Sequence, residues 1–372
     1  MATRTVSQAK NVLEGLTIQA TKPSKGSIAL DQWRGLALIL VLISHGFFFT
    51  GRVNGLGRIG VNLFFYISGI LVYRSLNKSR VEWWPLARSF WWRRIRRLYP
   101  ALISYVVVML VATVFLQHLS GLPPHSDLKS YAMALPYVLT YTLNYAHIYP
   151  NSLGHLWSLA CEMQFYLLAP FIFALGRGGR KRGLYVFGLL LLLFAGAGLI
   201  YPLRLAHYDP VKYHFEIAAW PMMFGFFCEF AKAWFMKIPR SLVKIIFGIG
   251  VAALIGSPVV SLFGMEMKKL VIAMGGLVLF PCLFSYLFEL PVPGIIGRSA
   301  AWVGERTYSI YLWEEPLTTC NFLPFMLQPL GAAVSIAIGA VWFRIFEMPF
   351  LSTGRVRQIE TAPTLVGSPS GR

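Results

Sequence analysis

The chain has 372 residues, of which 56% are hydrophobic and only 13% are charged, with a mean hydropathy of +0.59. Soluble domains typically carry about 25% charged residues, so this composition excludes an ordinary soluble protein and indicates a polytopic membrane protein. The formal net charge is +19. Because the basic residues form short runs between apolar segments, they favour membrane topology and contact with anionic groups over nucleic-acid binding.

The two ends of the chain differ from its middle. Residues 1–29 are rich in Ser, Thr, Gln and Lys without an apolar run, so we expect a disordered cytoplasmic tail rather than a cleaved signal peptide. Residues 351–372 are rich in Ser, Gly, Pro and Thr, and we expect a second disordered tail. Residues 30–350 form the predicted membrane domain. Neither a metal centre nor a disulfide framework is indicated, because no C-x-x-C pair occurs among Cys161, Cys228, Cys282 and Cys320.

Apolar segments long enough to cross a bilayer recur along the chain, and a spanning helix needs about 20 residues. They fall near 33–51, 58–76, 98–117, 156–175, 184–202, 215–235, 241–263, 270–289, 300–319 and 325–346. We therefore predict an all-α polytopic integral membrane protein with about ten transmembrane helices.

One further segment, 131–149, is interrupted by Pro136, Asn144 and His147. If it crossed the membrane, the basic run at 177–182 would face outward, against the positive-inside rule. If it instead lies in an outer excursion over 118–155, re-entrant or interfacial, every basic run faces the cytoplasm. We therefore predict that both termini are cytoplasmic and that the protein lies in the inner (cytoplasmic) membrane.

The first predicted span contains Arg34 near one end and His45 well inside it. Eleven residues at about 100° each make roughly three turns, so both side chains share a face about 16 Å apart along the axis. A histidine at membrane depth is a functional candidate because hydrocarbon penalises an unused polar ring. The structural alternative is an arginine that snorkels and a histidine that bonds to a neighbouring helix.

A cluster of arginines precedes the third predicted span: Arg93, Arg94, Arg96 and Arg97. On the cytoplasmic side such a cluster can clamp phosphate groups through several donors. It can equally act as a positive-inside anchor that snorkels to lipid headgroups. We favour ligand contact for Arg93 and Arg94.

The helix predicted at 155–166 aligns four polar side chains on one stripe: His155, Ser158, Glu162 and Tyr166. A carboxylate in an apolar helix is costly unless it is paired. Glu162 is therefore expected to orient His45, as a carboxylate orients the histidine of a catalytic triad, or to pair with an arginine such as Arg34. For Ser158 we expect an interhelical hydrogen bond rather than a nucleophile.

Tryptophans recur near the ends of the predicted spans, which is typical of an interfacial belt. They are Trp83, Trp84, Trp91, Trp92, Trp157 and Trp313. In the second span, Ser68 and Gly69 are expected to permit close helix packing beside the site.

Six motifs, in order along nearly the whole chain, resemble those of the acyltransferase-3 family. Its members are integral membrane acyltransferases that modify cell-surface glycans, lipids and some antibiotics. The motifs are Leu30–Ala37 together with His45, Gly60–Gly69, Phe90–Pro100, His155–Tyr166, Tyr308–Trp313 and Glu347–Phe350. Further candidates for the site lie in these motifs or next to them: Asp31, Ser68, His155, Trp157, Ser158, Tyr166, Trp313 and Glu314.

The resemblance implies an O-acyltransferase that moves an acyl group, acetyl or another short chain, from cytoplasmic acyl-CoA to a hydroxyl of a glycan or lipid-linked saccharide. It implies acetyl-CoA as the first choice of donor, and no metal. Arg34, Arg93 and Arg94 would hold the donor. His45 would act as a general base on the acceptor hydroxyl or carry the acyl group as an acyl-imidazole. We prefer the general base, because it needs no second covalent step.

The sequence departs from the family pattern at two positions. Asn62 stands where the family often has Asp, and Glu314 stands where it usually has His. A second histidine role therefore does not carry over, and whether Glu314 replaces it stays open. The family's frequent C-terminal esterase-like extension has no counterpart in this sequence, so we expect a stand-alone membrane module.

The sequence is also compatible with other functions. A transporter or flippase of lipid-linked sugars would account for the spans and the intramembrane charges, but not for the ordered motifs. A non-catalytic scaffold would keep the fold without the chemistry. Within the enzyme class, the acceptor could instead be a small molecule or a lipid. Protein-dependent consumption of the thioester separates an acyltransferase from both non-enzymatic alternatives.

Overall fold

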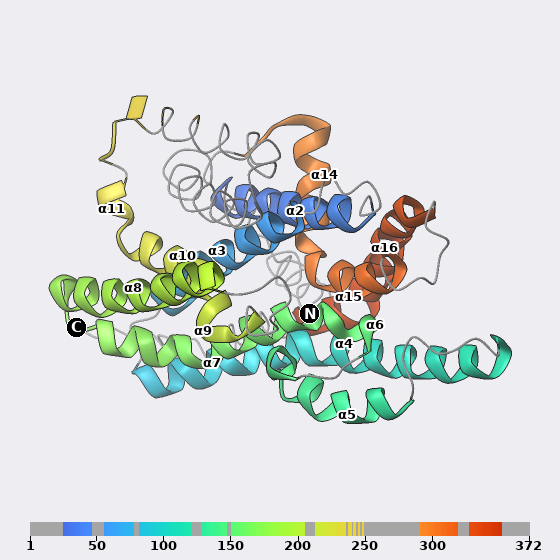
Figure 1. Cartoon of the computed structure of the whole chain (residues 1–372). Helices are drawn as coiled ribbons and strands as arrows, with labels where there is room; N and C mark the ends of the chain where they lie inside the picture. Colours follow the sequence, from blue (N-terminus) through green and yellow to red (C-terminus); the bar gives the residue numbers. More distant parts are fainter. Residues whose placement is uncertain are drawn as a thin grey trace, which may run out of the picture.

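A computed structural model describes most of the chain, and in these residues all regular structure is helical (Figure 1). The described residues are 25–46, 56–77, 82–120, 128–146, 150–204, 213–235, 237–239, 241–242, 245, 248, 291–318 and 327–351. The longer helices are α2 (Lys25–Gly46), α3 (Leu56–Asn77), α4 (Trp83–Ser120), α7 (Leu156–Gly176), α8 (Arg180–Arg204) and α16 (Gln328–Trp342). The shorter ones are α5 (Leu128–Leu139), α6 (Asn151–Gly154), α9 (Phe215–Ala218), α10 (Trp220–Phe230), α11 (Lys232–Phe235), α14 (Gly294–Glu305) and α15 (Thr307–Thr318).

Among the described residues, 6 helical segments are long and apolar enough to cross a membrane. They are Ile28–Gly46, Leu56–Asn77, Trp83–Phe115, Ser152–Gly176, Arg180–Gly198 and Gln328–Leu351. The last of these continues α16 through a π-helical turn, Phe343–Glu347. Each corresponds to one of the segments expected from the sequence, and together they establish a polytopic membrane protein.

Two of the remaining four expected spans are divided in the structure, and the other two are not tested by the described residues. The segment 215–235 is divided into α9, α10 and α11, with Pro221 in the first turn of α10, where its missing N–H costs no hydrogen bond. The segment 300–319 is divided at Arg306 between α14 and α15. Segments 241–263 and 270–289 lie largely or wholly outside the described residues. The count of about ten spans therefore stays a prediction.

The segment 131–149 does not form a spanning helix in its described part. Helix α5 has 12 residues, which at about 1.5 Å each cover only a little over half of the ~30 Å hydrocarbon core. A 3₁₀ turn at Leu143–Tyr145 follows it. Gln164 of α7 holds this turn, because its side-chain amide donates to Tyr141 O at 2.7 Å and to Asn144 Oδ1 at 2.8 Å.

Glycines bring the backbones of crossing helices into contact. A β-carbon on Gly69 of α3 would lie 2.0 Å from Met222 O of α10, and one on Gly225 of α10 would lie 2.0 Å from Tyr66 O of α3. Small residues of this kind let helices approach closely in a membrane, where the hydrophobic effect does not drive them together. The close packing expected at Gly69 is confirmed.

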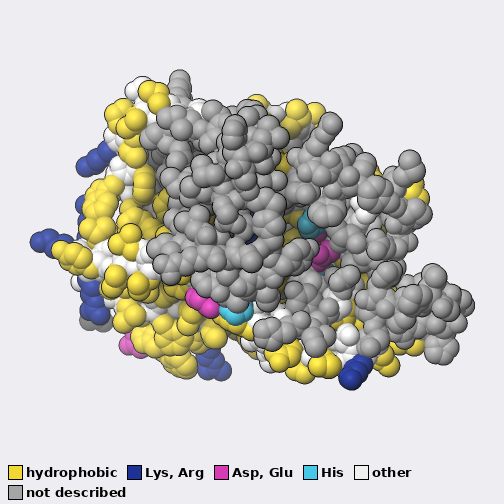
Figure 2. Space-filling view, in the orientation of Figure 1, with side chains coloured by type: hydrophobic (Ala, Val, Ile, Leu, Met, Phe, Trp, Pro, Cys, Tyr) yellow, Lys and Arg dark blue, Asp and Glu magenta, His cyan; other side chains and the backbone are white. Residues whose placement is uncertain are grey.

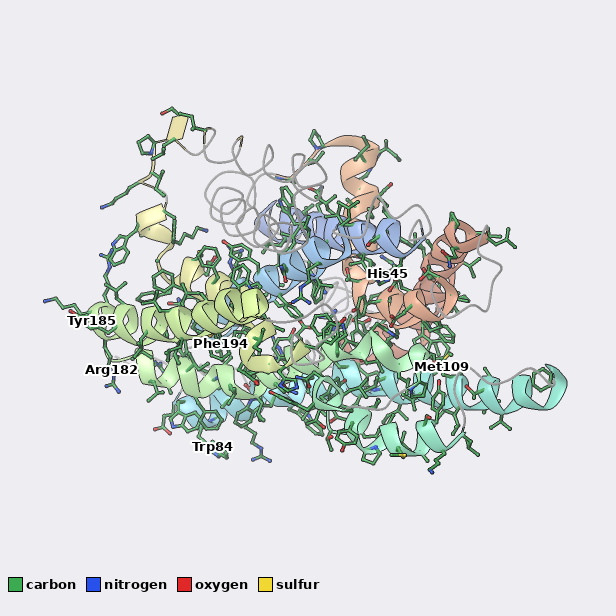
Figure 3. All side chains as sticks on the ribbon, viewed as in Figure 1. His45, Trp84, Met109, Arg182, Tyr185 and Phe194 are labelled. Atoms are coloured by element: carbon green, nitrogen blue, oxygen red, sulfur yellow. The ribbon has the colours of Figure 1, made fainter. Side chains whose placement is uncertain are left out.

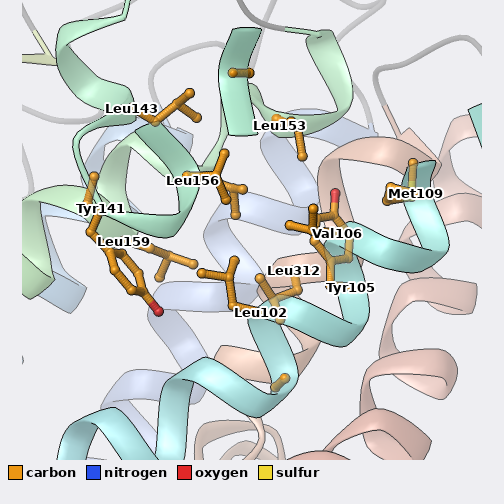
Figure 4. Packing of buried hydrophobic residues seen from close by; sticks show 14 of the residues in the cluster. Leu102, Tyr105, Val106, Met109, Tyr141, Leu143, Leu153, Leu156, Leu159 and Leu312 are labelled. Carbon is orange, nitrogen blue, oxygen red and sulfur yellow. The ribbon is translucent and has the colours of Figure 1, made fainter. Parts of the chain in front are cut away.

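Four hydrophobic clusters fill the space between the described helices, and two of them surround α7. The first joins α4, the 131–146 segment, α7 and α15 through residues such as Leu102, Tyr105, Leu156 and Leu312 (Figure 4). The second is rich in aromatic rings and joins α3, α7, α8 and α10. These contacts fix α7 against α3, α4 and α8, whereas α2 packs against α3, α14, α15 and α16.

The described basic and aromatic residues near the α7–α8 turn lie far from His45. Figure 3 shows Trp84, Arg182 and Tyr185 together at the left of the view, with His45 toward the right. In Figure 2, the visible Lys and Arg side chains gather mainly toward the left edge. We call the end of the molecule that carries Trp84, Arg182 and Tyr185 the basic end, and the end that carries His45 the His45 end.

Filling the space at Gly225 should destabilise the fold. The methyl group of Gly225→Ala would force α3 and α10 apart, and overpacking of this kind costs about 1–3 kcal/mol. We expect a lower thermal unfolding midpoint for the purified protein in detergent. Gly196→Ala on α8 is the matched control, because a β-carbon there has no other atom within 4 Å. Equal midpoints for the two variants would contradict the close approach of α3 and α10.

Candidate active site

A histidine and a carboxylate from two helices meet at the centre of the site. His45 lies in the last turn of α2, and its Nδ1 donates a hydrogen bond to Oε1 of Glu314 on α15. The Glu314 side chain is 0% exposed, whereas that of His45 is 27% exposed. Because Nδ1 is held by the carboxylate, Nε2 is the ring nitrogen left for a substrate. Glu314 therefore occupies the partner position that the sequence left open.

Glu162 does not take the role at His45 that we expected for it. It accepts hydrogen bonds from Ser68 Oγ, at 2.5 Å, and from the Tyr166 hydroxyl. The alternative partner, Arg34, instead lies with its Nη1 3.6 Å from Asp31 Oδ1. The reason is helix packing, since α7 lies against α3 and so turns Glu162 toward Ser68. The helical spacing predicted that Glu162 shares a face of α7 with other polar residues, but it could not predict which helix packs against that face.

Arg94 points into the protein beside the Glu162 carboxylate. Its guanidinium carbon lies 3.8 Å from the ring centroid of Phe90 and 4.4 Å from that of Tyr166. The neighbouring Arg93 is exposed. The two arginines predicted as a pair thus face different surroundings, and Arg94 joins Ser68, Glu162 and Tyr166 in one polar cluster, called here the Glu162 cluster.

Arg97 makes a buried ion pair with Glu347. Its Nε lies 2.7 Å from Oε1 of Glu347, a side chain that is 0% exposed. The other carboxylate oxygen accepts a hydrogen bond from Ser309 Oγ at 2.9 Å. Removing one partner of such a pair leaves an uncompensated buried charge, so Arg97 serves to tie α4 to α15 and to the π-helical turn.

A second histidine, His155, is buried between α7 and α15. Its Nε2 donates to Leu312 O at 3.1 Å, and its Nδ1 lies 2.9 Å from Glu315 Oε2 without making a hydrogen bond. Ser158 Oγ donates to the Tyr311 hydroxyl at 2.8 Å, which is the interhelical hydrogen bond predicted for this serine. His155 and Ser158 therefore hold α7 against α15.

One of the tryptophans assigned to an interfacial belt is a core residue. Trp313 is 8% exposed and packs against Tyr105 and Trp342, with ring centroids 5.4 and 5.0 Å away. Trp157 is half-buried and packs against Phe65 and Tyr213 at 6.1 and 4.5 Å. The belt prediction was wrong for Trp313, because position along a span does not reveal which side faces other helices.

An apolar cavity runs beside α2 between the levels of Arg34 and His45. Its volume is about 390 Å³, including space open to its surroundings. Side chains of α2, α3, α7 and α15 line it, among them Leu38, Val41, Val61, Phe64, Leu159 and Tyr308. The cavity therefore lies between the two α2 residues to which the sequence assigned donor binding and base catalysis.

Three polar residues were missed from the sequence: Arg58, Tyr311 and Glu315. Glu315 directly follows Glu314 in an otherwise apolar segment, and two adjacent carboxylates there were a signal for buried partners. Arg58 opens the second predicted span, where we attributed no role to it.

The chain belongs to the acyltransferase-3 family, described as "Acyltransferase domain", which it matches over residues 27–346. It is 27% identical over 360 residues to the peptidoglycan O-acetyltransferase OatA of Listeria monocytogenes, covering 88% of this chain and 56% of that protein. It is 28% identical over 316 residues to the putative peptidoglycan O-acetyltransferase YrhL of Bacillus subtilis, covering 77% and 48%. For the O-acetyltransferase OatA of Staphylococcus aureus, the values are 25% over 363 residues, covering 87% and 57%.

The chain thus spans about half the length of these curated relatives. No solved structure matches it.

Proposed function

We propose that the protein is a membrane-bound O-acyltransferase that moves an acyl group from cytoplasmic acyl-CoA to a hydroxyl of a glycan. The observation that carries the proposal is the contact of His45 Nδ1 with the buried Glu314 carboxylate, in a chain of the acyltransferase-3 family. The relatives are named O-acetyltransferases, two of them for peptidoglycan, which favours acetyl-CoA as donor and a cell-surface polysaccharide as acceptor.

In this mechanism His45 is the general base. Its Nε2 takes the proton of the acceptor hydroxyl as that oxygen attacks the thioester carbonyl carbon. The carbon–sulfur bond then breaks, and the departing CoA sulfur receives the proton from the imidazolium. Glu314 fixes the tautomer and stabilises the imidazolium, as the carboxylate of a serine hydrolase triad does, while the acceptor hydroxyl takes the place of the serine.

The donor is proposed to lie along α2. Arg34 and His45 are eleven residues apart on this one helix, so they are separated by about 16 Å along its axis. The apolar cavity between their levels marks the proposed path of the pantetheine arm. Its water-accessible volume is only about 30 Å³, so the side chains that line it would have to move aside to admit the arm. Arg34 and Arg94 would contact the phosphates as charge-assisted donors, and Arg93 would add charge at the membrane surface.

The proposed topology places the basic end in the cytoplasm, where acyl-CoA is made, and the His45 end toward the outside. Both termini are then cytoplasmic, and residues 30–350 form the membrane domain with about ten spans. The chain would lie in the cytoplasmic membrane. A glycan or lipid-linked saccharide would reach His45 from the opposite side to the donor.

Substitution of His45 should abolish transfer. The main test variant is His45→Gln, whose side-chain amide N–H can still donate to the buried Glu314 carboxylate and so keep the fold. An amide cannot take up a proton and a general base typically contributes 10²–10⁴-fold, so we expect His45→Gln to lower kcat by that factor while acetyl-CoA binding is kept. His45→Ala should fail as well, but it also leaves the buried carboxylate without a partner. The readout is acetylated acceptor measured by mass spectrometry with purified protein. His214→Gln, a histidine outside the site, should keep its activity, and near-normal turnover in His45→Ala would remove His45 from the chemistry.

Arg94 and Arg93 should differ in their effect on the donor. Hydrogen bonds to charged groups are worth about 1.5–3 kcal/mol, so Arg94→Gln should weaken acetyl-CoA binding about tenfold or more. Arg93→Gln should have a smaller effect, because its side chain is exposed. Calorimetric titration of acetyl-CoA into each detergent-solubilised variant gives the two affinities. Unchanged affinity in Arg94→Gln would assign this arginine to packing alone.

A further inference from the structure

Arg58 belongs to the turn of α3 that borders His45. Arg58 is in the first turn of α3, one residue after Gly57. A β-carbon on Gly57 would lie 3.7 Å from His45 Nε2 and 3.0 Å from Ser44 Oγ. The first turn of α3 therefore borders the space in which an acceptor hydroxyl would have to sit.

Aromatic rings hold the Arg58 side chain in place. Its guanidinium carbon lies 5.5 Å from the ring centroid of Trp157, and the residue is half-buried. Trp157 is itself fixed, with its ring 4.5 Å from Tyr213 and 6.1 Å from Phe65. A cation over a tryptophan face is attracted to the ring, but the contact does not neutralise its charge.

Arg58 has no carboxylate within ion-pair distance in the described part of the chain. Two other half-buried arginines there do have one, Arg74 with Glu229 at 2.9 Å and Arg97 with Glu347 at 2.7 Å. The acids nearest to the site, Glu314 and Glu315, are already paired with His45 and His155.

A partly desolvated cation without a counter-charge is costly to keep. The guanidinium of Arg58, which is unpaired among the described residues and lies on the turn of α3 that borders His45, is therefore expected to attract an anion.

We propose that Arg58 binds an oxyanion carried by the acceptor saccharide, either a sugar carboxylate or the phosphate of a lipid-linked saccharide. A bidentate contact to such a group suits a guanidinium and would orient the acceptor hydroxyl toward His45 Nε2. The site would thereby select acidic over neutral glycans. The orienting role rests on the proposed acyl transfer, whereas the anion site stands on its own geometry.

The test is a binding experiment with protein in phosphatidylcholine nanodiscs. The probes are a disaccharide with one carboxylate, its methyl ester, and the ester attached to a prenyl pyrophosphate. We expect at least one anionic probe to bind about tenfold or more tightly than the ester. Arg58→Gln should erase this preference, and Arg58→Lys, which keeps the charge but not the planar fork, should keep part of it. Arg182→Gln, an exposed arginine at the basic end, is the matched control and should behave as the wild type.

The identity of the preferred probe distinguishes a sugar carboxylate from a lipid-linked phosphate. Equal binding of all three probes by the wild type would overturn the proposal, and that comparison holds even if Arg58→Gln does not insert. A preference that survives in Arg58→Gln would overturn it as well. Anion binding without any acetyl transfer would leave the anion site standing and remove the proposed function. Equal acetyl transfer to charged and neutral acceptors would leave the proposed function standing and remove the anion site.

Discussion

Glu314 is a carboxylate with no exposed surface in a protein that crosses a membrane, and His45 is the group that compensates it. A buried charge without a partner would destabilise the fold strongly, so this contact constrains where α2 and α15 lie relative to each other. It also decides the chemistry, because a carboxylate on Nδ1 leaves Nε2 as the reactive nitrogen. Helix α2 also packs against α14 and α16.

Adjacent acids on α15 connect two distant parts of the chain. Glu314 contacts His45 of α2, and Glu315 contacts His155 at the start of α7. The two histidines differ in access, since the His45 side chain is 27% exposed whereas His155 is 3% exposed and its Nε2 is bonded to a backbone carbonyl. A histidine–glutamate pair thus forms the candidate reactive site at Glu314, whereas the neighbouring pair at Glu315 links α15 to the start of α7. Arg58 completes the His45 end as a cation whose counter-charge is proposed to come from the acceptor.

How much the sequence could predict depends on whether a feature belongs to one helix or to a contact between helices. The placement of Arg34 and His45 on one helix is a local property, and it was predicted. The small residue Gly69 also predicted a close helix contact, but not that α10 is the helix it meets. The partner of Glu162 and the burial of Trp313 depend on which helices meet, which the 3.6-residue period does not contain. The division of 300–319 at Arg306 was missed for a related reason: hydropathy detects apolar length and is blind to a break in the backbone. Glu314 was noticed as a departure from the family pattern, but only the position of α15 beside α2 gives it a role.

The central claim is that acyl transfer runs from the basic end to the His45 end. The most direct measurement uses proteoliposomes in which the orientation of the protein is uniform, acetyl-CoA is added on one side and a glycan acceptor on the other. We predict acetylated glycan only when acetyl-CoA is on the side of the α7–α8 turn and the acceptor is on the His45 side, and none with His45→Ala. Product formed only when donor and acceptor share one compartment would contradict the account.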